Sequence, residues 1–324
     1  MEQDFVVGVD IGGQTAKIGI VDRKGTVVSE PRIIRSDTHT DEHLFFDDLT
    51  QAINELITET GATGKIKGVG IGAPNGNYYD GTIVHAPNLT WGGRKMIKVA
   101  EILSGKLGLP VILTNDANAA AVGEMTYGAA IGMKNFIMIT LGTGVGSGIV
   151  INGQVVYGHD GFAGELGHTT AVRYNGRQCN CGRVGCIEAY ASAIGLARTA
   201  REFIESNVDK DEFNQRSPLR EITGSITSKD VYMAAMQEDG LAKKVFDYTG
   251  RKLGESLADF VAFSAPQAII LFGGLAKAGD FIMKPTEQAM NENMLSIWKD
   301  KVPIVISKLP ESDAAILGAG ALAW

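Results

Sequence analysis

Cysteine is scarce in this sequence: the 324 residues contain three, all of them between Arg177 and Cys186. Three cysteines cannot all pair within one chain, which argues against a secreted fold held together by disulfide bonds. No stretch approaches roughly 18 uninterrupted apolar residues, and the opening segment MEQDFVVGVDIGG lacks a basic region followed by a long apolar run. These absences predict a soluble cytoplasmic protein that does not enter a membrane.

Basic residues are in deficit as well. The chain has 30 Lys and Arg residues against 37 Asp and Glu residues, so its net charge is −7 at pH 7. A net negative charge opposes non-specific attraction to nucleic acid and to anionic lipid, so neither is an expected partner. Glycine, by contrast, fills 41 of the 324 positions, well above its usual share of about 7%. The chain also exceeds the size at which one hydrophobic core stops growing, which predicts two domains.

Two glycine-rich segments share one arrangement of strands. Residues 5–28 read as three strands, because β-branched runs are separated by glycine turns at residues 12–13 and 24–25. Residues 136–156 repeat this arrangement, with their first turn at residues 142–146. The repeat, offset by about 130 residues, predicts that the chain consists of two related halves. Chance similarity between two glycine-rich hairpins is the alternative interpretation.

Hydrophobic periodicity predicts further helices and strands between and after these segments. Compact apolar runs at residues 67–73 and 110–116 lead into polar residues, as buried strands do when their C-terminal ends meet a ligand. The last segment, SDAAILGAGALAW, reads as a helix of small residues that packs closely on its neighbours. Helices are predicted at residues 41–60, 94–107, 186–205, 228–237 and 240–264, and a further buried strand at residues 268–274.

Both glycine turns offer backbone N–H groups that can point at an anion, since glycine lacks a Cβ atom and can adopt positive φ. A phosphate group is the natural occupant. Neither turn fits the G-x-x-x-x-G-K-[ST] loop or a G-x-G-x-x-G turn that opens a helix, so the two common nucleotide-binding motifs are absent from both. Taken singly, either turn is as readily a tight hairpin. Their matching places in two related halves favour phosphate binding.

Six short motifs together resemble one protein family. They are Asp10-Ile11-Gly12-Gly13 with Lys17, Leu141-Gly142-Thr143-Gly144-Val145-Gly146, Asn115-Asp116-Ala117-Asn118-Ala119, Gly164-Glu165-Leu166-Gly167-His168, Cys179-x-Cys181-Gly182-x-x-Gly185-Cys186-x-Glu188 and Phe272-Gly273-Gly274. Over nearly the whole chain they resemble the sugar-kinase, heat-shock-protein and actin superfamily, and within it the ROK family of sugar kinases. The resemblance implies a duplicated α/β fold of the ribonuclease H-like, actin-like type, with two domains and a cleft. We place one domain at residues 1–116 with 312–324, and the other at residues 117–311, which include a zinc loop.

Asp116 follows the apolar strand PVILT and precedes the alanine-rich segment ANAAAVGEM. From the residues alone, an Asp in this place is more often the N-cap of a helix. The resemblance implies instead that Asp116 is the catalytic base, which accepts the proton of a sugar hydroxyl as that oxygen attacks the γ-phosphate of ATP. The residues implied to contact the sugar are Gly72, Asn88, Asn115, Asp116, Glu165, His168 and Glu188.

ATP is the implied phosphoryl donor, bound together with Mg²⁺ that phosphate oxygens and water mainly hold. The implied nucleotide contacts are Asp10, Gly12, Gly13, Gln14, Thr15, Lys17, Gly142, Thr143, Gly144, Gly273 and Gly274. The last two are assigned to adenosine, although a helix start that needs glycine for close packing is the alternative. Two positions depart from the family pattern: Gln14 stands where a hydroxyl residue is common, and Asn75 stands where the family often has glycine.

The C-x-C-x4-C run offers three of the four ligands that a structural zinc site requires. His168 is the nearest histidine and precedes Cys179 by eleven residues, so the loop between them could return it to the cluster. Spacing alone leaves three free thiols on a loop as an alternative. The resemblance implies a structural zinc ion bound by His168, Cys179, Cys181 and Cys186. One ring nitrogen of His168 would then bind zinc while the other meets the sugar.

Residues and resemblance together predict an ATP-dependent hexokinase that phosphorylates the 6-hydroxyl of an aldohexose, with glucose as the first choice and glucose 6-phosphate as the product. N-acetylmannosamine, N-acetylglucosamine, mannose and fructose are the alternative substrates. A sugar-sensing repressor of the same family is disfavoured, since the first expected strand begins near Phe5 and leaves no room for a helix-turn-helix. A structural protein of the actin class is disfavoured because it does not need the E-L-G-H and C-x-C motifs. The family implies a homodimer.

Overall fold

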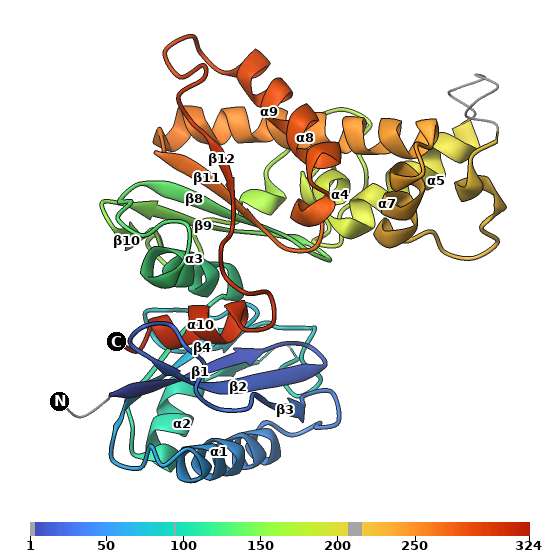
Figure 1. Ribbon diagram of the computed structural model, residues 1–324. Coiled ribbons are helices and arrows are strands. Elements are labelled where there is room, and N and C mark those ends of the chain that lie inside the picture. Colours follow the sequence, from blue (N-terminus) through green and yellow to red (C-terminus); the bar gives the residue numbers. More distant parts are fainter. Residues whose placement is uncertain (1–3, 94, 207–215) are drawn as a thin grey trace. The chain divides into compact units, whose positions relative to one another are not determined.

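The computed structural model describes residues 4–93, 95–206 and 216–324 and divides the chain into two compact units (Figure 1). Unit 1 comprises Met1–Lys134, Gly148–Gly164 and Ser307–Trp324, and unit 2 comprises Asn135–Ser147 and Glu165–Ile306. The boundary expected at residue 116 differs from this division. The helix that begins there stays with unit 1, because it packs against the C-terminal helix of the chain.

A five-stranded sheet of order β3-β2-β1-β4-β7 forms the centre of unit 1. Its first three strands are antiparallel neighbours, and the last two continue the sheet in parallel with β1. The strands are β1 (Phe5–Ile11), β2 (Thr15–Asp22), β3 (Arg32–Arg35), β4 (Ile66–Gly72) and β7 (Val111–Thr114). A separate pair joins β5 (Ile83–Val84) to β6 (Met96–Ile97). The strand at residues 96–97 explains why the next helix begins at Val99 and not at the expected residue 94.

Helices cover both faces of this sheet (Figure 1). The helices are α1 (Glu42–Glu59), α2 (Val99–Leu107), α3 (Asp116–Tyr127) and α10 (Ala314–Ala321). α10 packs on β1 and β4 so closely that a Cβ atom on Gly8 would lie 2.0 Å from the Ile316 carbonyl oxygen. A Cβ atom on Gly70 would lie 1.8 Å from the Ala319 carbonyl oxygen. The close packing predicted for the small-residue C-terminal helix is therefore confirmed, and strand glycines make it possible.

A second five-stranded sheet repeats the strand arrangement, and its strands β8, β11 and β12 belong to unit 2. It has the order β10-β9-β8-β11-β12, in which β8, β11 and β12 run parallel and β10 pairs antiparallel with β9. The strands are β8 (Phe136–Leu141), β9 (Val145–Ile151), β10 (Gln154–Val155), β11 (Ala268–Phe272) and β12 (Ile304–Ile306). Both sheets thus place a glycine turn directly after their central strand. The duplication predicted from the two glycine-rich segments is confirmed.

The helices of unit 2 build one hydrophobic core against its sheet. They are α4 (Glu188–Ala191), α5 (Ala193–Ser206), α7 (Ser228–Met236), α8 (Gly240–Ser264) and α9 (Asp280–Asn293), with short 3₁₀ turns at Leu166–His168, Pro218–Glu221 and Ala276–Ala278. The single helix expected at residues 186–205 is interrupted at Ser192, whose backbone is extended. The Ala193 N–H donates instead to the Gly142 carbonyl at 2.8 Å, so a contact with the glycine turn breaks the helix.

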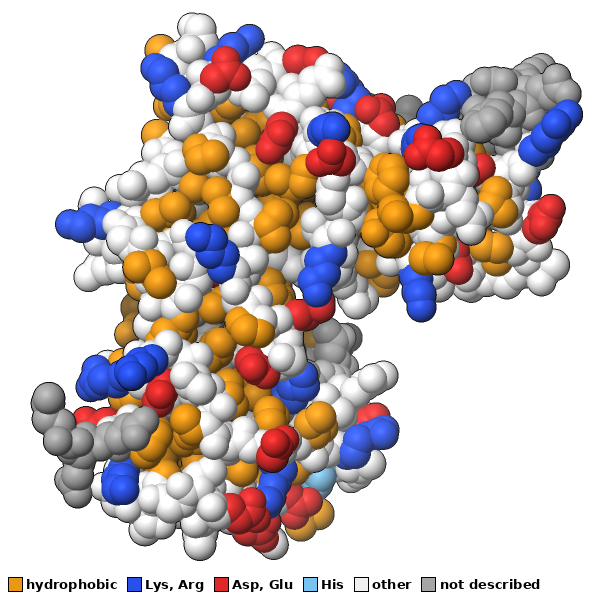
Figure 2. All heavy atoms as spheres, in the orientation of Figure 1, with side chains coloured by type: hydrophobic (Ala, Val, Ile, Leu, Met, Phe, Trp, Pro, Cys, Tyr) orange, Lys and Arg blue, Asp and Glu red, His pale blue; other side chains and the backbone are white. Residues whose placement is uncertain are grey.

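On the face drawn in Figure 2, Lys and Arg side chains lie among Asp and Glu side chains on both units. Among the described residues, no helix combines the length and the apolar character needed to cross a membrane.

Candidate active site and metal centre

The first glycine turn joins β1 to β2 in unit 1. The Gly12 N–H donates to the Thr15 carbonyl at 2.9 Å, which closes the turn. A Cβ atom on Gly13 would lie 2.8 Å from the Asn88 carbonyl oxygen, so glycine is needed for this approach. Gln14 is exposed, and its carbonyl accepts the Ser36 N–H at 2.9 Å. The turn therefore brings Asn88, an expected sugar contact, next to the expected phosphate contacts.

Asp10 is the next-to-last residue of β1, beside this turn, and pairs in register with Lys17 on β2. Burial and the neighbouring Asp116 carboxylate raise the pKa of Asp10 to about 6, against the opposing effect of the Lys17 charge. Lys17 Nζ also donates to the Ser312 carbonyl at 3.4 Å. A carboxyl group with a pKa near 6 and a partly buried lysine opposite it on the next strand suit a site that receives a charged ligand.

Asp116 is the first residue of α3, but it is not the N-cap. The cap is Asn115, whose Oδ1 accepts the Asn118 N–H at 2.7 Å. Asp116 Oδ1 accepts the Ala117 N–H at 2.8 Å. Asp116 is exposed, yet protein fills most of the volume around it, and this desolvation raises the pKa of its carboxyl despite the backbone hydrogen bonds. The N-cap interpretation of Asp116 is wrong, because Asn115 takes that role.

The sugar loop expected after β4 contains Asn75, a residue with positive φ. Asn75 has φ 53°, in the left-handed region that glycine favours and that asparagine tolerates. Its side-chain Nδ2 donates to the His85 carbonyl at 2.7 Å. A Cβ atom on Gly72 would lie 3.6 Å from the Asp116 Cα and 4.0 Å from Asp10 Oδ1. Gly72, Asp10 and Asp116 are therefore neighbours, as expected for one site.

The second glycine turn, in unit 2, faces Glu188. The Gly142 N–H donates to the Gly144 carbonyl at 3.0 Å, and the Val145 N–H donates to Glu188 Oε2 at 3.0 Å. A Cβ atom on Gly144 would lie 2.4 Å from the same carboxylate oxygen. Glu188 opens α4, as the sequence led us to expect for a residue just after the cysteines. An expected sugar contact thus touches an expected phosphate turn.

Gly273 and Gly274 follow β11, and Gly273 lies against Leu141, the last residue of β8 before the second glycine turn. Gly273 has φ +106°, and a Cβ atom on it would lie 2.5 Å from the Leu141 carbonyl oxygen. Gly274 lines a cavity of about 340 Å³ whose other walls include Tyr232 and Phe246. Close packing accounts for Gly273, whereas Gly274 has open space around its Cα. The cavity beside Gly274 has the volume of a small-molecule site, and its walls include two aromatic side chains.

His168 and the three cysteines converge in unit 2. One ligand atom from each, a ring nitrogen or a sulfur, lies within 4.8 Å of the others. Cys181 Sγ and Cys186 Sγ are 3.7 Å apart, and Cys179 Sγ is 3.9 Å from His168 Nδ1. A Cβ atom on Gly167 would lie 2.0 Å from the Val145 carbonyl oxygen, so the turn that carries His168 lies directly on β9. The prediction that His168 lies beside the three cysteines is therefore confirmed.

These four residues fit a tetrahedral zinc ion. With Zn–S bonds of about 2.3 Å, two sulfurs in a tetrahedron lie about 3.8 Å apart, which agrees with the separation of 3.7 Å between Cys181 and Cys186. Three cysteine sulfurs and one imidazole nitrogen are also a set of ligands that binds zinc, whereas magnesium and calcium favour oxygen ligands. His168 Nδ1 faces the cluster, which leaves the other ring nitrogen for a further partner.

The predicted site residues fall into two groups, one in each unit. Unit 1 holds Asp10, Gly12, Gly13, Gln14, Thr15, Lys17, Gly72, Asn88, Asn115 and Asp116, and unit 2 holds Gly142, Thr143, Gly144, Glu165, His168, Cys179, Cys181, Cys186, Glu188, Gly273 and Gly274. Sequence reasoning missed Arg183, whose Nη1 donates to the His168 carbonyl at 2.9 Å. It also missed Arg177, the buried first residue of the cysteine segment. The sequence does not show which residues these two arginines contact, because the partners, His168 and Glu202, lie 15 and 25 residues away in the chain.

Two related α/β units, each with a glycine turn after its central strand, and a Cys3His cluster define the class of two-domain sugar-kinase folds. The crystal structure of a ROK family glucokinase from Streptomyces griseus, in complex with glucose and AMPPNP, has this fold. It superposes with a TM-score of 0.76 at 31% identity, over 98% of each chain. The ROK family profile matches residues 6–324, and the protein belongs to the ROK family. The resemblance inferred from the sequence motifs is therefore confirmed.

Proteins of two functional kinds match this chain over nearly its whole length. A glucokinase of Halalkalibacterium halodurans is 36% identical over 322 residues, which cover 99% of this chain and 95% of that protein. A xylose repressor of Caldicellulosiruptor bescii is 28% identical over 322 residues, which cover 98% of this chain but 77% of the repressor. Family membership alone thus does not separate enzymes from regulators, so function must be argued from the site.

Proposed function

We propose that this protein is an ATP-dependent hexose kinase that transfers the γ-phosphate to the 6-hydroxyl of glucose. The observation that carries the proposal is the placement of Asp116. Its carboxylate lies at the start of α3, beside Asp10 and Gly72, with one oxygen bound to the Ala117 N–H. A regulator that only binds sugar has no need of a carboxylate with a raised pKa in this place. The related glucokinases, one of them crystallised with glucose and an ATP analogue, support the same reaction.

In the proposed reaction, Asp116 accepts the proton of the sugar 6-hydroxyl as that oxygen attacks phosphorus. Desolvation raises the pKa of Asp116, and a higher pKa makes a carboxylate a stronger base. The hydrogen bond from the Ala117 N–H holds Oδ1 and leaves Oδ2 for the hydroxyl. Phosphoryl transfer otherwise depends on positioning and on charge stabilisation, which the two glycine turns supply through their N–H groups.

Nucleotide contacts are proposed in each unit by itself: at the first glycine turn in unit 1, and at the second glycine turn and the cavity beside Gly274 in unit 2. A cavity of about 340 Å³ bordered by Tyr232 and Phe246 is of the size that small-molecule sites have, and aromatic walls suit an adenine ring. Lys17 is the positive side chain assigned to the phosphates in unit 1. Mg²⁺ is expected to arrive with ATP, held mainly by phosphate oxygens.

We propose glucose as the substrate, ahead of the N-acetylhexosamines, mannose and fructose. Asn75 stands in the sugar loop where the family often has glycine. Its φ of 53° retains the backbone path that glycine would take, and its side chain is turned to the His85 carbonyl. Neither observation on Asn75 argues against glucose, and the related glucokinases support it. Asn88, Glu165, His168 and Glu188 are assigned to the remaining hydroxyls.

Zinc is proposed as a structural ion in the Cys3His cluster. When bound, it would hold loop 179–186 closed and anchor the imidazole of His168. Cys179 Sγ lies 3.5 Å from Glu188 Oε1, so the cluster and the sugar contact are adjacent. Zinc chemistry in the reaction itself is not required.

A coupled assay with ATP tests the proposal over glucose, mannose, fructose, N-acetylglucosamine and N-acetylmannosamine. The highest kcat/KM is expected with glucose. A higher kcat/KM with an N-acetylhexosamine would correct the substrate, and no turnover with any sugar, together with DNA binding, would replace the kinase by a regulator. The homodimer and the cytoplasmic location remain predictions, which light scattering and cell fractionation test.

A further inference from the structure

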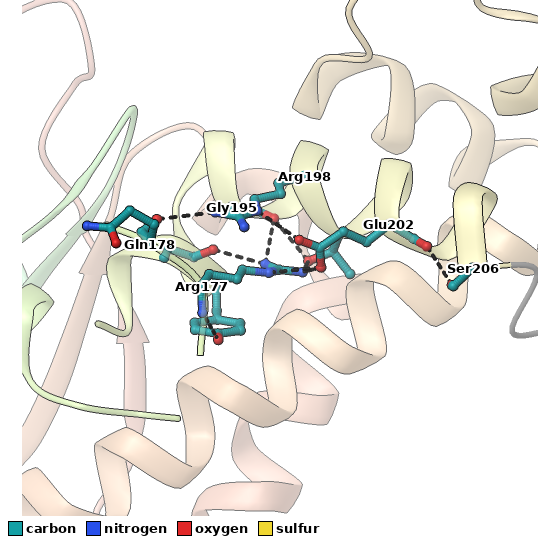
Figure 3. Close-up of polar contacts among 9 residues, drawn as sticks. Arg177, Gln178, Gly195, Arg198, Glu202 and Ser206 are labelled. Carbon is teal, nitrogen blue, oxygen red and sulfur yellow. Dashed lines mark hydrogen bonds and ion pairs between the residues drawn. The ribbon is translucent and has the colours of Figure 1, made fainter. Parts of the chain in front are cut away.

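Arg177 is a buried charged residue at the base of the cysteine loop. Its side chain is 6% exposed, although arginine is rarely buried without a dedicated partner. Figure 3 shows its guanidinium group directed at Glu202 on α5, with Gly195 beside it. Nothing in the proposed reaction requires this residue to touch the sugar or the nucleotide. Its burial therefore has another cause.

The guanidinium group of Arg177 uses all three of its nitrogens. Nε and Nη2 both donate to Glu202 Oε2, at 3.0 and 2.7 Å. Nη2 also donates to Thr199 Oγ1 at 2.8 Å. Nη1 donates to the carbonyl oxygens of Ala189, at 2.9 Å, and Gly195, at 3.2 Å. These acceptors belong to α4 and α5, so one side chain ties both helices together where they meet.

Two aromatic rings and the backbone complete the attachment. The guanidinium carbon lies 4.5 Å from the centre of the Tyr190 ring and 5.8 Å from that of Tyr248, within the range of cation–π attraction. The Arg177 N–H donates to the Tyr190 hydroxyl at 2.8 Å, and its carbonyl accepts the Gly185 N–H at 2.8 Å. Arg177 is thus joined to both ends of the loop that holds the cysteines.

Glu202 is held by two arginines. Burial opposes ionisation of Glu202, but hydrogen bonds from Arg177 and Arg198 outweigh it and lower the pKa of this carboxyl. Arg198 is more exposed and donates from the same helix, four residues earlier. Of the two arginines only Arg177 is buried, and its pair with the partly exposed Glu202 is the one that links the loop to α5.

The helix that Arg177 holds begins with Glu188. Arg177 Nη1 binds the carbonyl of Ala189, the residue directly after Glu188. Glu188 in turn accepts the Val145 N–H of the second glycine turn. α4 is only four residues long, and a helix this short has little intrinsic stability. The direction of the Glu188 side chain therefore depends on contacts from outside the helix.

We propose that Arg177 is a positioning residue for the sugar site, which orients Glu188 by clamping the cysteine loop to the corner between α4 and α5. This inference rests on the proposed function, in which Glu188 binds a sugar hydroxyl. Lysine cannot replace arginine here, because an ammonium group lacks the planar fork that reaches a carboxylate and two carbonyls together. The second glycine turn also has a hydrogen bond of its own, from the Gly142 N–H to the Gly144 carbonyl, so we expect nucleotide binding to depend less on the clamp than sugar binding does.

Arg177→Lys tests the clamp in the full-length, zinc-loaded protein. The KM for glucose is expected to rise at least fivefold, while the KM for ATP stays within twofold and zinc content stays near one per chain. Glu202→Gln, which keeps the size of the partner and removes its charge, is expected to shift the glucose KM in the same direction by a smaller factor. It also tests the clamp if Arg177→Lys does not fold.

Arg251→Lys is the matched control. It makes the same replacement at an Arg–Glu ion pair of 2.8 Å between α8 and α9, outside the site, and should leave both KM values within twofold. An equal rise in both KM values for Arg177→Lys, or an unchanged glucose KM, would overturn the inference.

Titration calorimetry of glucose without nucleotide separates this inference from the proposed function. A fivefold weaker Kd for Arg177→Lys is expected even where turnover is not measured. If the unmodified protein binds glucose but does not phosphorylate it, the kinase proposal fails and the calorimetry still decides the role of Arg177. An unchanged Kd would refute that role.

Discussion

Replacing Gly144 by alanine adds one methyl group where the second glycine turn faces Glu188. The added Cβ atom would lie 2.4 Å from Glu188 Oε2, about 1 Å closer than an ordinary van der Waals contact. The obstacle is the end of a flexible side chain, so the carboxylate can move away while the backbone stays in place. That movement breaks the hydrogen bond of 3.0 Å from the Val145 N–H.

The magnitude follows from that bond. A hydrogen bond to a charged group contributes about 1.5–3 kcal/mol, and about 1.4 kcal/mol corresponds to a tenfold change in affinity. If Glu188 must keep its position to bind the sugar, Gly144→Ala should raise the glucose KM at least tenfold. The loss of stability should be smaller, near 1 kcal/mol, because alanine also restricts the unfolded chain. The Tm should then fall by no more than about 4 °C.

Gly142→Ala in the same turn is the control. No atom lies within 4 Å of the Cβ it would add, and neither glycine has a positive φ. Both variants lose a glycine from the turn, but only Gly144→Ala displaces Glu188. Steady-state kinetics with glucose and ATP on both variants therefore separates the two effects. A glucose KM for Gly144→Ala within twofold of that for Gly142→Ala would refute the reasoning.

Three further predictions follow from the titratable and metal-binding groups. Asp116→Asn should lower kcat by about 10²–10⁴ without loss of thermal stability; a kcat within tenfold of the unmodified protein would remove Asp116 as the base. Because the pKa of Asp10 is raised to about 6, its protonated form favours the fold at low pH, and this contribution is lost as pH rises through about 6. Asp10→Asn should therefore resist urea better than the unmodified protein at pH 8, by about 2–3 kcal/mol without ligands, with the gain vanishing near pH 4; a gain independent of pH would contradict this. Cys181→Ser should abolish the single zinc expected by elemental analysis and weaken glucose binding at least tenfold, whereas full activity in a metal-free preparation would contradict the structural role of zinc.

Local chemistry accounts for the parts of the fold that sequence reasoning predicted well. Glycine turns after apolar strands were predictable because glycine lacks a Cβ atom, and the long helix α8 (Gly240–Ser264) was predictable from its periodicity and from Pro266 beyond its end. The interruption at Ser192 was not predictable. It depends on the Ala193 N–H finding the Gly142 carbonyl, a partner that no local pattern identifies.

Asp116 shows the same limit within the site. An acidic residue before an alanine-rich helix is typical of an N-cap, and the neighbouring Asn115 is equally suited to that role. The structure gives the cap to Asn115, and the proximity of Asp10 and Gly72 follows from strand order. The sequence showed both side-chain types, but it did not show which of Asn115 and Asp116 caps the helix.

The sequence by itself determined the residue types of the metal cluster, the two glycine turns and the membership of the ROK family, because these depend on short spacings and on side-chain chemistry. Only the tertiary structure decided that Glu188 meets the second glycine turn and that Arg177 is buried against Glu202. It also decided that Gly8 and Gly70 make room for α10. Each of these contacts joins segments that are far apart in the chain, and only the packing of helices on sheets brings such segments within contact distance.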